Sequence, residues 1–175
     1  NTAEGQISVT LKGNTYTNIV KNGNFSQGTT GWDRSGATLS ATNNTLSVVG
    51  TGVSSGIHAY QTTQLDNVAG KKVYVRAKVK VTNNVCTAIQ LYPSSLGAGY
   101  ANTPVVINNP LMNQVYIISC IGIAQTTDSN KCRINIRHLY ADAATANEKV
   151  LEVQEVIAID LTATFGAGQE PSKEQ

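Results

Sequence analysis

The chain has 175 residues, of which 41% are hydrophobic and only 14% charged, and its formal net charge is +2 at pH 7. This length is enough to bury a core, and the small net charge lacks the basic excess of nucleic-acid-binding proteins. No run approaches the ~18 consecutive apolar residues of a membrane-spanning helix. We therefore expect neither a nucleic acid nor a membrane as partner.

Three segments are expected along the chain. Residues 1–16 form an N-terminal arm or linker with two short alternating runs, residues 17–166 form a β-sandwich domain, and residues 167–175 are a polar tail leading into a following segment. Pro171–Glu174 has the pattern of a helix start. Because the chain begins at Asn1 and not at a methionine, we expect it to be part of a longer protein.

The sequence Asn22–Trp32, NGNFSQGTTGW, contains the single tryptophan of the chain. Asn and Gly tolerate left-handed backbone angles, so the chain can turn sharply just before Phe25. Isolated aromatic residues usually pack, and we expect Phe25 and Trp32 to anchor the core.

Alternating apolar and polar residues predict strands in the middle of the chain. Thr42-Asn43-Asn44 separates two such runs and predicts a hairpin. The clearest run is KKVYVRAKVKVT, with the valines on one face. In the later runs VCTAIQLY and CRINIRHLYA, Ile89, Leu91 and two further isoleucines oppose polar or aromatic neighbours.

The last third of the chain is expected to hold two long strands. VYIISCIGIA is nearly continuously apolar and is predicted to be buried on both faces, and VLEVQEVIAIDLTATF is predicted to run as a strand up to Gly166. Residues 141–149 form either a helical turn or a loop. Eight to ten strands predict an all-β, two-sheet sandwich. Its expected core includes Phe25, Trp32, Val75, Val79, Ile89, Ile117, Ile121 and Ile159.

The three cysteines, Cys86, Cys120 and Cys132, lie in apolar runs with no CxxC spacing. We expect buried free thiols, which fits folding in a reducing cytoplasm.

An ordered set of motifs carries a family resemblance: NGNFSQGTTGW, then YQTTQL and GKKVYVRAKVKV, then IAIDLTATFG. The set resembles the jelly-roll carbohydrate-binding modules of families four, nine and twenty-two, which begin with Asn-Gly-x-Phe and a later Gly-Trp. A closer resemblance is to minor structural and tail proteins of phages and prophages of Gram-positive bacteria. It is carried by the segments TNIVKNGNFSQGTTGW and DLTATFGAGQEPSKEQ. The resemblance covers residues 17–175 and implies a jelly-roll module associated with a virion.

The sugar-binding relatives tie the first strand to the last with a calcium ion. The resemblance implies that Asn24, through its carbonyl, and Asp160 would hold a structural Ca²⁺ here. Ser26 stands where those relatives have an acidic ligand, and losing a carboxylate weakens calcium binding. The alternative is that Asp160 caps or hydrogen-bonds the turn at Asn22–Asn24 without a metal.

No motif indicates catalysis. The chain lacks GxSxG, HExxH, a phosphate loop and GxGxxG, and it has two histidines, His58 and His138. Paired carboxylates for glycoside cleavage are a spatial feature that a sequence does not reveal, but strand alternation puts Glu152 and Glu155 on opposite faces. We therefore expect no enzyme.

Polar and aromatic side chains that alternate with core residues are the candidate ligand-binding set. Aromatic rings suit the apolar face of a sugar, and amide or guanidinium groups suit its hydroxyls, carboxylates or phosphates. We expect one outward face to carry Tyr60, Arg76, Gln90, Tyr92 and Arg137. The alternative is that Arg76 and Arg137 pair with Glu152 or Glu155 across strands.

Together these observations predict a non-catalytic glycan-binding module of a phage tail or tail-fibre protein, folded in the bacterial host cytoplasm and acting outside the cell. Its partners would be a host cell-surface glycan, other tail subunits and possible further copies of the chain. Two alternatives stay open: a structural or assembly module of the tail without a sugar ligand, and a module appended to a secreted glycoside hydrolase.

Overall fold

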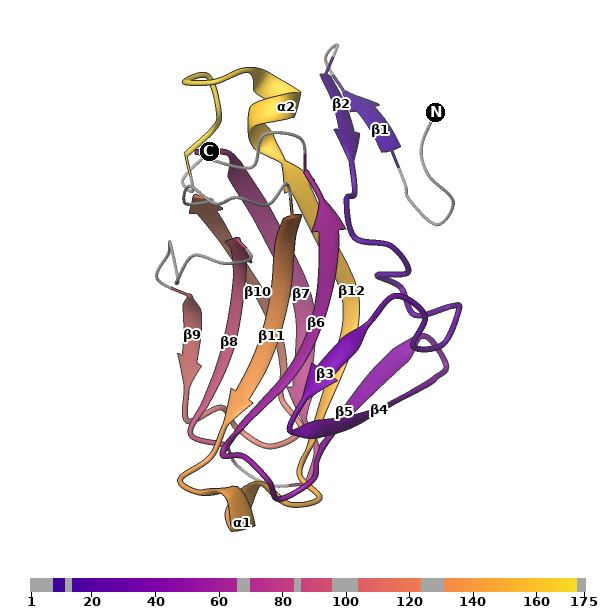
Figure 1. Cartoon of the computed structure of the whole chain (residues 1–175), viewed down its shortest axis with the longest axis vertical. Helices are drawn as coiled ribbons and strands as arrows, with labels where there is room; N and C mark the ends of the chain where they lie inside the picture. Colours follow the sequence, from indigo (N-terminus) through magenta and orange to yellow (C-terminus); the bar gives the residue numbers. More distant parts are fainter. Residues whose placement is uncertain are drawn as a thin grey trace.

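The computed structural model describes residues 8–11, 14–65, 70–83, 86–95, 104–123 and 131–172. Two five-stranded antiparallel sheets pack face to face, and a two-stranded ribbon lies beside them (Figure 1). The predicted all-β sandwich of jelly-roll type is confirmed. Within these residues, no helix is long and apolar enough to cross a membrane.

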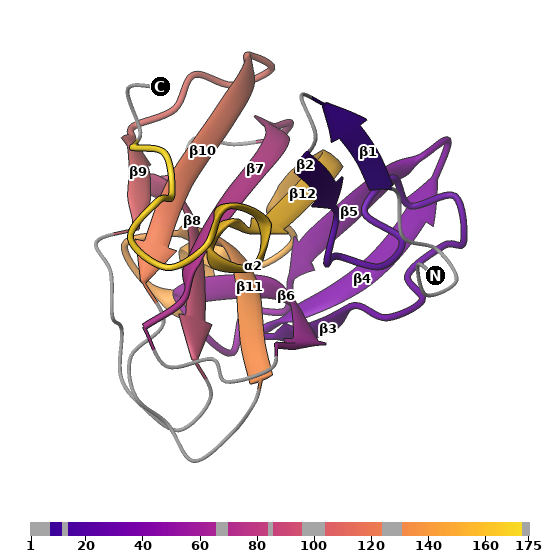
Figure 2. The ribbon, with the colours of Figure 1, turned by 90° about the horizontal axis from the view of Figure 1, so that it is seen from above.

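The first sheet has the strand order β10-β7-β12-β5-β4, and the second has the order β3-β6-β11-β8-β9. Seen from above, the strands of the two sheets form two layers (Figure 2). The first sheet consists of β4 (Ala37–Thr42), β5 (Thr45–Gly50), β7 (Lys72–Val81), β10 (Val115–Ile123) and β12 (Val150–Asp160). The second consists of β3 (Asp33–Ser35), β6 (Gly56–Gln64), β8 (Ala88–Ser95), β9 (Val105–Asn108) and β11 (Lys131–Leu139).

The remaining elements lie at the edges of the sandwich. The ribbon pairs β1 (Ser8–Leu11) with β2 (Asn14–Thr17), and the short helices α1 (Ala143–Ala146) and α2 (Leu161–Phe165) lie at opposite ends of the sandwich (Figure 1). Helix α1 settles the open alternative at residues 141–149 in favour of a helical turn. The predicted segment boundaries stay predictions.

The core lies between the sheets and follows the alternation of the strands. On β7, the inward residues from Val73 to Val81 are all at most 1% exposed. Of the expected core residues, Phe25, Trp32, Val75, Val79 and Ile89 are buried. The three cysteines are buried free thiols, as predicted, and burial raises the pKa of Cys86 to about 11. The expected hairpin is also present, because Asn43 and Asn44 take positive φ angles of 50° and 58° between β4 and β5.

The prediction that VYIISCIGIA is buried on both faces is wrong. This segment forms β10, an edge strand of the first sheet that pairs with β7. Its inward residues, Ile118 and Cys120, join the core, whereas Ile117 is 62% exposed and Ile121 is half-buried. A continuous apolar run is equally compatible with a central strand, and only the pairing order distinguishes the two.

The last strand also differs from expectation. β12 ends at Asp160, whose side chain accepts a hydrogen bond from the Ala163 N–H and so caps α2, where the sequence predicted continued strand. A β-bulge between Gln154 and Ile157 shifts the alternation by one residue. Ile159 therefore lies half-buried on the outer side rather than in the core. The predicted helix start at Pro171–Glu174 lies partly outside the described residues, and the described part of it is not helical.

Candidate functional site

The outer face of the second sheet gathers most of the predicted ligand-binding residues. Ile57, Ile89 and Ile134 point into the core, so their neighbours along β6, β8 and β11 emerge on the opposite side. We call this surface the arginine face. It comprises Asp33, Ser35, His58, Tyr60, Thr62, Gln90, Tyr92, Ser94, Arg133, Asn135 and Arg137.

Strand register orders the arginine face into three rows that run across the strands. The first row is Ser35, His58, Arg137 and Gln90, the second is Asp33, Tyr60, Asn135 and Tyr92, and the third is Thr62, Arg133 and Ser94. Neighbouring strands lie ~4.8 Å apart, so members of one row can contact one another directly.

Arg133 and Tyr60 form the centre of this face. The guanidinium carbon of Arg133 lies 4.2 Å from the centroid of the Tyr60 ring, which is a cation–π contact. The Tyr60 hydroxyl donates to Asp33 Oδ2 at 3.1 Å. Burial and this hydrogen bond raise the pKa of Tyr60. These contacts place the Arg133 guanidinium over the Tyr60 ring, which Asp33 in turn holds.

Arg137 is held in a different way. Its guanidinium lies over Gly56, so close that a Cβ added there would stand 2.3 Å from Nη2. Gly56 thus makes room for the flat guanidinium on the sheet. His58 opposes Arg137 in the strand register. Burial, Arg137 and Arg133 together lower the pKa of His58 to about 4, so its imidazole is neutral at pH 7.

Three polar atoms of the arginine face are buried without a hydrogen-bond partner: His58 Nε2, Arg133 Nε and Arg137 Nε. No carboxylate of the described residues forms an ion pair with Arg133 or Arg137. Buried polar atoms normally find partners, and each unpartnered one calls for an explanation. Arg133 and Arg137 are themselves partly exposed, so a ligand on this face meets the exposed part of each guanidinium and not the buried Nε atom.

The structure brings four of the five predicted ligand residues to one face and corrects two details. Tyr60, Gln90 and Arg137 are partly exposed there, whereas Tyr92 is 2% exposed and does not present its ring to solvent. Arg76 lies on β7 in the other sheet, so the expected grouping is wrong for this residue. Whether any of them binds a ligand stays a prediction.

On the outer face of the first sheet, the basic residues of β7 have acidic partners. Arg76 and Lys78 lie 3.7 and 3.6 Å from the carboxylate of Glu155, and Lys80 lies 2.7 Å from Glu152. The alternative of cross-strand pairing thus holds for Arg76 but not for Arg137. The bulge in β12 places both glutamates on this face, so the expectation that they lie on opposite faces is wrong.

The predicted calcium ligands, Asn24 and Asp160, are not brought together. Ile19 and Gly23 do run alongside β12, through hydrogen bonds to Ala158 and Val156. Asp160 lies four residues beyond Val156, which is ~13 Å along a strand. The Asn24 side chain instead accepts hydrogen bonds from the N–H and hydroxyl of Ser26.

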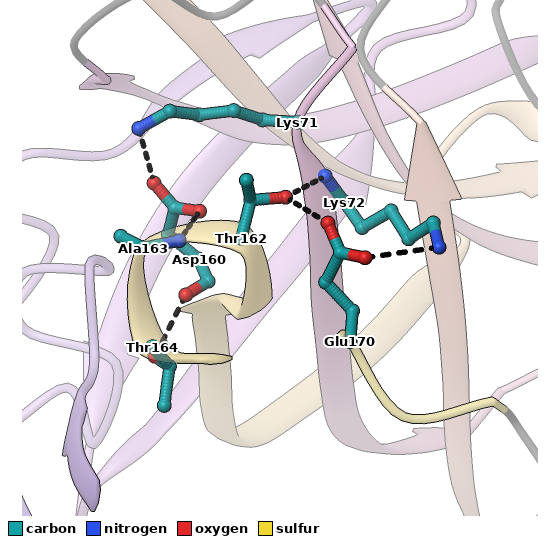
Figure 3. A network of polar contacts seen from close by, with 7 residues as sticks. All are labelled: Lys71, Lys72, Asp160, Thr162, Ala163, Thr164 and Glu170. Carbon is teal, nitrogen blue, oxygen red and sulfur yellow. Dashed lines mark hydrogen bonds and ion pairs between the residues drawn. The ribbon is translucent and has the colours of Figure 1, made fainter. Parts of the chain in front are cut away.

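The surroundings of Asp160 do not fit a calcium ion. Lys71 Nζ lies 2.6 Å from Asp160 Oδ2, and Oδ1 caps α2 (Figure 3). An ammonium group thus occupies the side of the carboxylate that a cation would need. No group of three or more His, Cys, Asp or Glu side chains in the described part of the chain could hold a metal ion. The alternative that Asp160 caps the Asn22–Asn24 turn is also wrong, because it caps α2.

The turn before Phe25 is organised by Asn22. This buried residue has φ 51°, and its side-chain amide donates to the carbonyls of Gly28 and Thr30 at 3.0 and 3.1 Å. Its carbonyl accepts the indole N–H of Trp32 at 3.3 Å. The expected left-handed turn and aromatic anchors are present, and their role is structural.

The ionisable members of the arginine face that sequence reasoning missed are Arg133, His58 and Asp33. The signal for Arg133 was available, because CRINIR places Arg133 and Arg137 four residues apart and therefore on the same side of a strand. His58 alternates with core residues in the same way. Asp33 reaches the face because β3 pairs with β6, which the sequence does not reveal.

No family model and no curated protein matches the chain. Solved structures do share its fold. An arabinose-bound α-L-arabinofuranosidase, MgGH51, superposes with a TM-score of 0.64 and 11% identity over 81% of this chain. The CBM22-2 xylan-binding domain of Paenibacillus barcinonensis Xyn10C gives 0.55 and 13% over 79% of this chain and 97% of its own. The enzymatically active domain of tailspike protein 4 of bacteriophage CBA120 gives 0.56 and 14% over 81% of this chain.

The chain spans about a quarter of the arabinofuranosidase (26%) and about a fifth of the tailspike chain (21%), but nearly the whole xylan-binding domain. At these identities the likeness establishes the fold alone: a β-sandwich of the type found in carbohydrate-binding modules.

Proposed function

We propose that the chain is a non-catalytic glycan-binding module that attaches to polysaccharide through the arginine face. One observation carries the proposal: an exposed sheet face with planar guanidinium, amide and phenol groups, three of whose polar atoms are buried without partners. Sugars offer hydroxyl oxygens as acceptors for such donors, and bound sugar displaces water from the apolar edges of the rings.

The fold comparison supports this proposal without identifying a ligand. A xylan-binding domain has the same sandwich over nearly its whole length. Among the described residues, the arginine face contains one carboxylate, Asp33, which accepts a hydrogen bond from Tyr60. Glycoside cleavage generally needs two carboxyl groups on either side of the scissile bond, so the face favours binding over cleavage.

The setting we propose is the tail of a phage, where the module would hold the particle to a host cell-surface glycan. Support comes from the resemblance of the two end motifs to phage tail proteins and from the shared fold with a phage tailspike domain. Such a protein folds in the host cytoplasm before it acts outside the cell. Three buried free thiols fit folding under reducing conditions.

A second candidate is an assembly module of the tail that binds no sugar. The outward side of the edge strand β10 favours it, because Val115, Ile117 and Ile123 are 49%, 62% and 47% exposed and the strand carries no charge. Apolar residues on an edge strand suit contact with another subunit or a second copy. A module appended to a secreted glycoside hydrolase is a third candidate, favoured by the match to an arabinofuranosidase chain.

Binding of the purified chain to a glycan array and to isolated Gram-positive cell walls tests the proposal. We expect binding that falls in Arg137→Ala and Gln90→Ala and is retained in Arg76→Ala, which removes a matched arginine from the other sheet. Equal thermal stability of the variants would show that the loss is local. If the wild type binds no glycan and no cell wall, the proposed glycan-binding function is wrong and the assembly-module function takes its place.

A further inference from the structure

We infer that the glycan bound by the arginine face is anionic, and that its carboxylate or phosphate groups are held by Arg133 and Arg137. The inference rests on the proposed function and names the ligand class of the same site. It follows from four features: guanidiniums whose Nε atoms have no acceptor within the protein, packing of both guanidiniums against the sheet, uncompensated charge and the spacing of the two arginines.

The unpartnered atoms are the first feature. The Nε atoms of Arg133 and Arg137 are both buried without an acceptor. Both side chains are partly exposed, and a guanidinium can bind a carboxylate or phosphate end-on, with its two Nη atoms donating two parallel hydrogen bonds. A neutral sugar hydroxyl accepts one such bond, whereas an anionic group accepts both and supplies the opposite charge.

The second feature is that each guanidinium already packs against the sheet. Arg133 stacks on the Tyr60 ring at 4.2 Å, and the Tyr60 hydroxyl is tied to Asp33. Arg137 lies flat over Gly56, where any Cβ would clash with it. Side chains held in this way lose little conformational freedom when a ligand binds, so the free protein already has a binding geometry.

The third feature is the charge of the face. Two arginines stand against one acid, Asp33, and no described carboxylate forms an ion pair with either arginine. His58, which lies opposite Arg137 in the register, is kept neutral by burial and by the two arginines, which lower its pKa to about 4. The net charge at pH 7 is therefore positive and is uncompensated within the described residues.

The fourth feature is spacing. Arg133 and Arg137 are four residues apart on β11, which corresponds to ~13 Å between their Cα atoms. One carboxylate or phosphate group is too small to contact both arginines at this distance. The two cations therefore suit separate charged groups of one polymer chain laid along the sheet, and they disfavour a single small anion.

Three polymers test the inference on the full chain by calorimetry at pH 7: polygalacturonate, the same polymer with its carboxyl groups reduced to hydroxymethyl, and a poly(glycerol phosphate). The variants are Arg133→Gln with Arg137→Gln, and Arg76→Gln as the control from the other sheet. Gln preserves most of the side-chain length and a hydrogen-bonding amide while removing the charge.

We expect at least one polyanion to bind ~10-fold or more tightly than the reduced polymer, and the double variant to lose this difference while Arg76→Gln retains it. Preference for polygalacturonate identifies carboxylate as the source, and preference for poly(glycerol phosphate) identifies phosphate. Binding of the reduced polymer at equal or greater strength overturns the inference and leaves the proposed function standing. Polyanion binding that persists in the double variant also overturns it. If these polymers, the glycan array and the cell walls all fail to bind, both the inference and the proposed function are wrong.

Discussion

Both sheets carry basic residues on their outer faces, but the two sheets differ in whether these residues form ion pairs with carboxylates. On the first sheet, Arg76, Lys78 and Lys80 are paired with Glu155 and Glu152 from the neighbouring strand β12. On the second sheet, the arginines of β11 have no acidic partner among the described residues, and polar atoms of both are buried without an acceptor.

The difference shows why a count of basic residues does not locate a binding face. The run KKVYVRAKVKV is the most basic stretch of the chain, but each of its basic residues forms an ion pair within the protein, with Asp160, Glu170, Glu155 or Glu152. Arg133 and Arg137 belong to a less conspicuous segment. Charge that a fold leaves uncompensated is the better guide to a ligand.

The largest expected effect that separates the two sheets is the response of stability to acid. Both histidines belong to the second sheet, and burial is the main cause that lowers their pKa values, to about 4 for His58 and about 3 for His138. The groups that face His58 are Arg137 and Arg133 from β11, and Asp33 and Tyr60 lie in the next row.

Because the unfolded chain binds these protons near pH 6.5 and the folded protein does not, stability is complete above pH 6.5. It falls by ~1.4 kcal/mol per pH unit for each histidine as the pH drops towards 4. Urea unfolding between pH 7 and 4.5 measures this slope. His58→Gln should roughly halve it, and a stability that does not change over this range would contradict the burial of both imidazoles.

The next largest effect distinguishes the two tyrosines of the arginine face. Tyr92 is 2% exposed, so Tyr92→Ala should cost ~3 kcal/mol of unfolding free energy through lost packing. Tyr60→Ala removes a partly exposed ring and should cost less than half as much. Thermal unfolding of both variants checks the order, and equal losses would contradict the different burial of the two rings.

A single substitution should give an arginine of the second sheet a cross-strand carboxylate partner, as Arg76 has on the first sheet. Thr62 is exposed and lies opposite Arg133 in the strand register. Thr62→Glu would supply the cross-strand carboxylate that Glu155 gives Arg76, and we expect anionic-glycan binding to fall ~10-fold. Thr62→Gln, of the same size but neutral, should retain most of the binding. Equal binding by the two variants would show that charge at Arg133 does not matter.

The smallest effect is expected on the first sheet. Lys80 and Glu152 are both about a third exposed on their side chains (33% and 29%), and exposed ion pairs contribute little. Glu152→Gln should lower the unfolding free energy by less than ~1 kcal/mol and leave glycan binding unchanged. A large loss of stability, or a gain of polyanion binding equal to that of the arginine face, would remove the contrast between the sheets.

Alternation along the strands was sufficient to predict the sandwich, most of its core and the outward direction of Tyr60, Gln90 and Arg137. These features depend on local period-2 geometry, which the sequence contains. The placement of Arg76 with them was wrong because the sheet to which β7 belongs is decided by pairing between distant segments.

Three other errors share this non-local origin. Ile117 was assigned to the core because its apolar run does not reveal that β10 is an edge strand. Ile159 was assigned there because a bulge shifts the alternation by one residue. The expected approach of Asp160 to Asn24 was wrong because the pairing of Gly23 with Val156 places the two apart, and calcium binding itself stays a prediction.

The most direct measurement of the central claim follows the arginine side chains themselves. In nitrogen–proton correlation spectra recorded during titration with the anionic polymer, the Nε–H signals of Arg133 and Arg137 should shift in saturable fashion together with backbone signals of β6, β8 and β11. The Nε–H signal of Arg76 should stay in place. Shifts confined to β7 and β10, or a saturable titration that leaves both β11 arginines unmoved, would contradict binding at the arginine face.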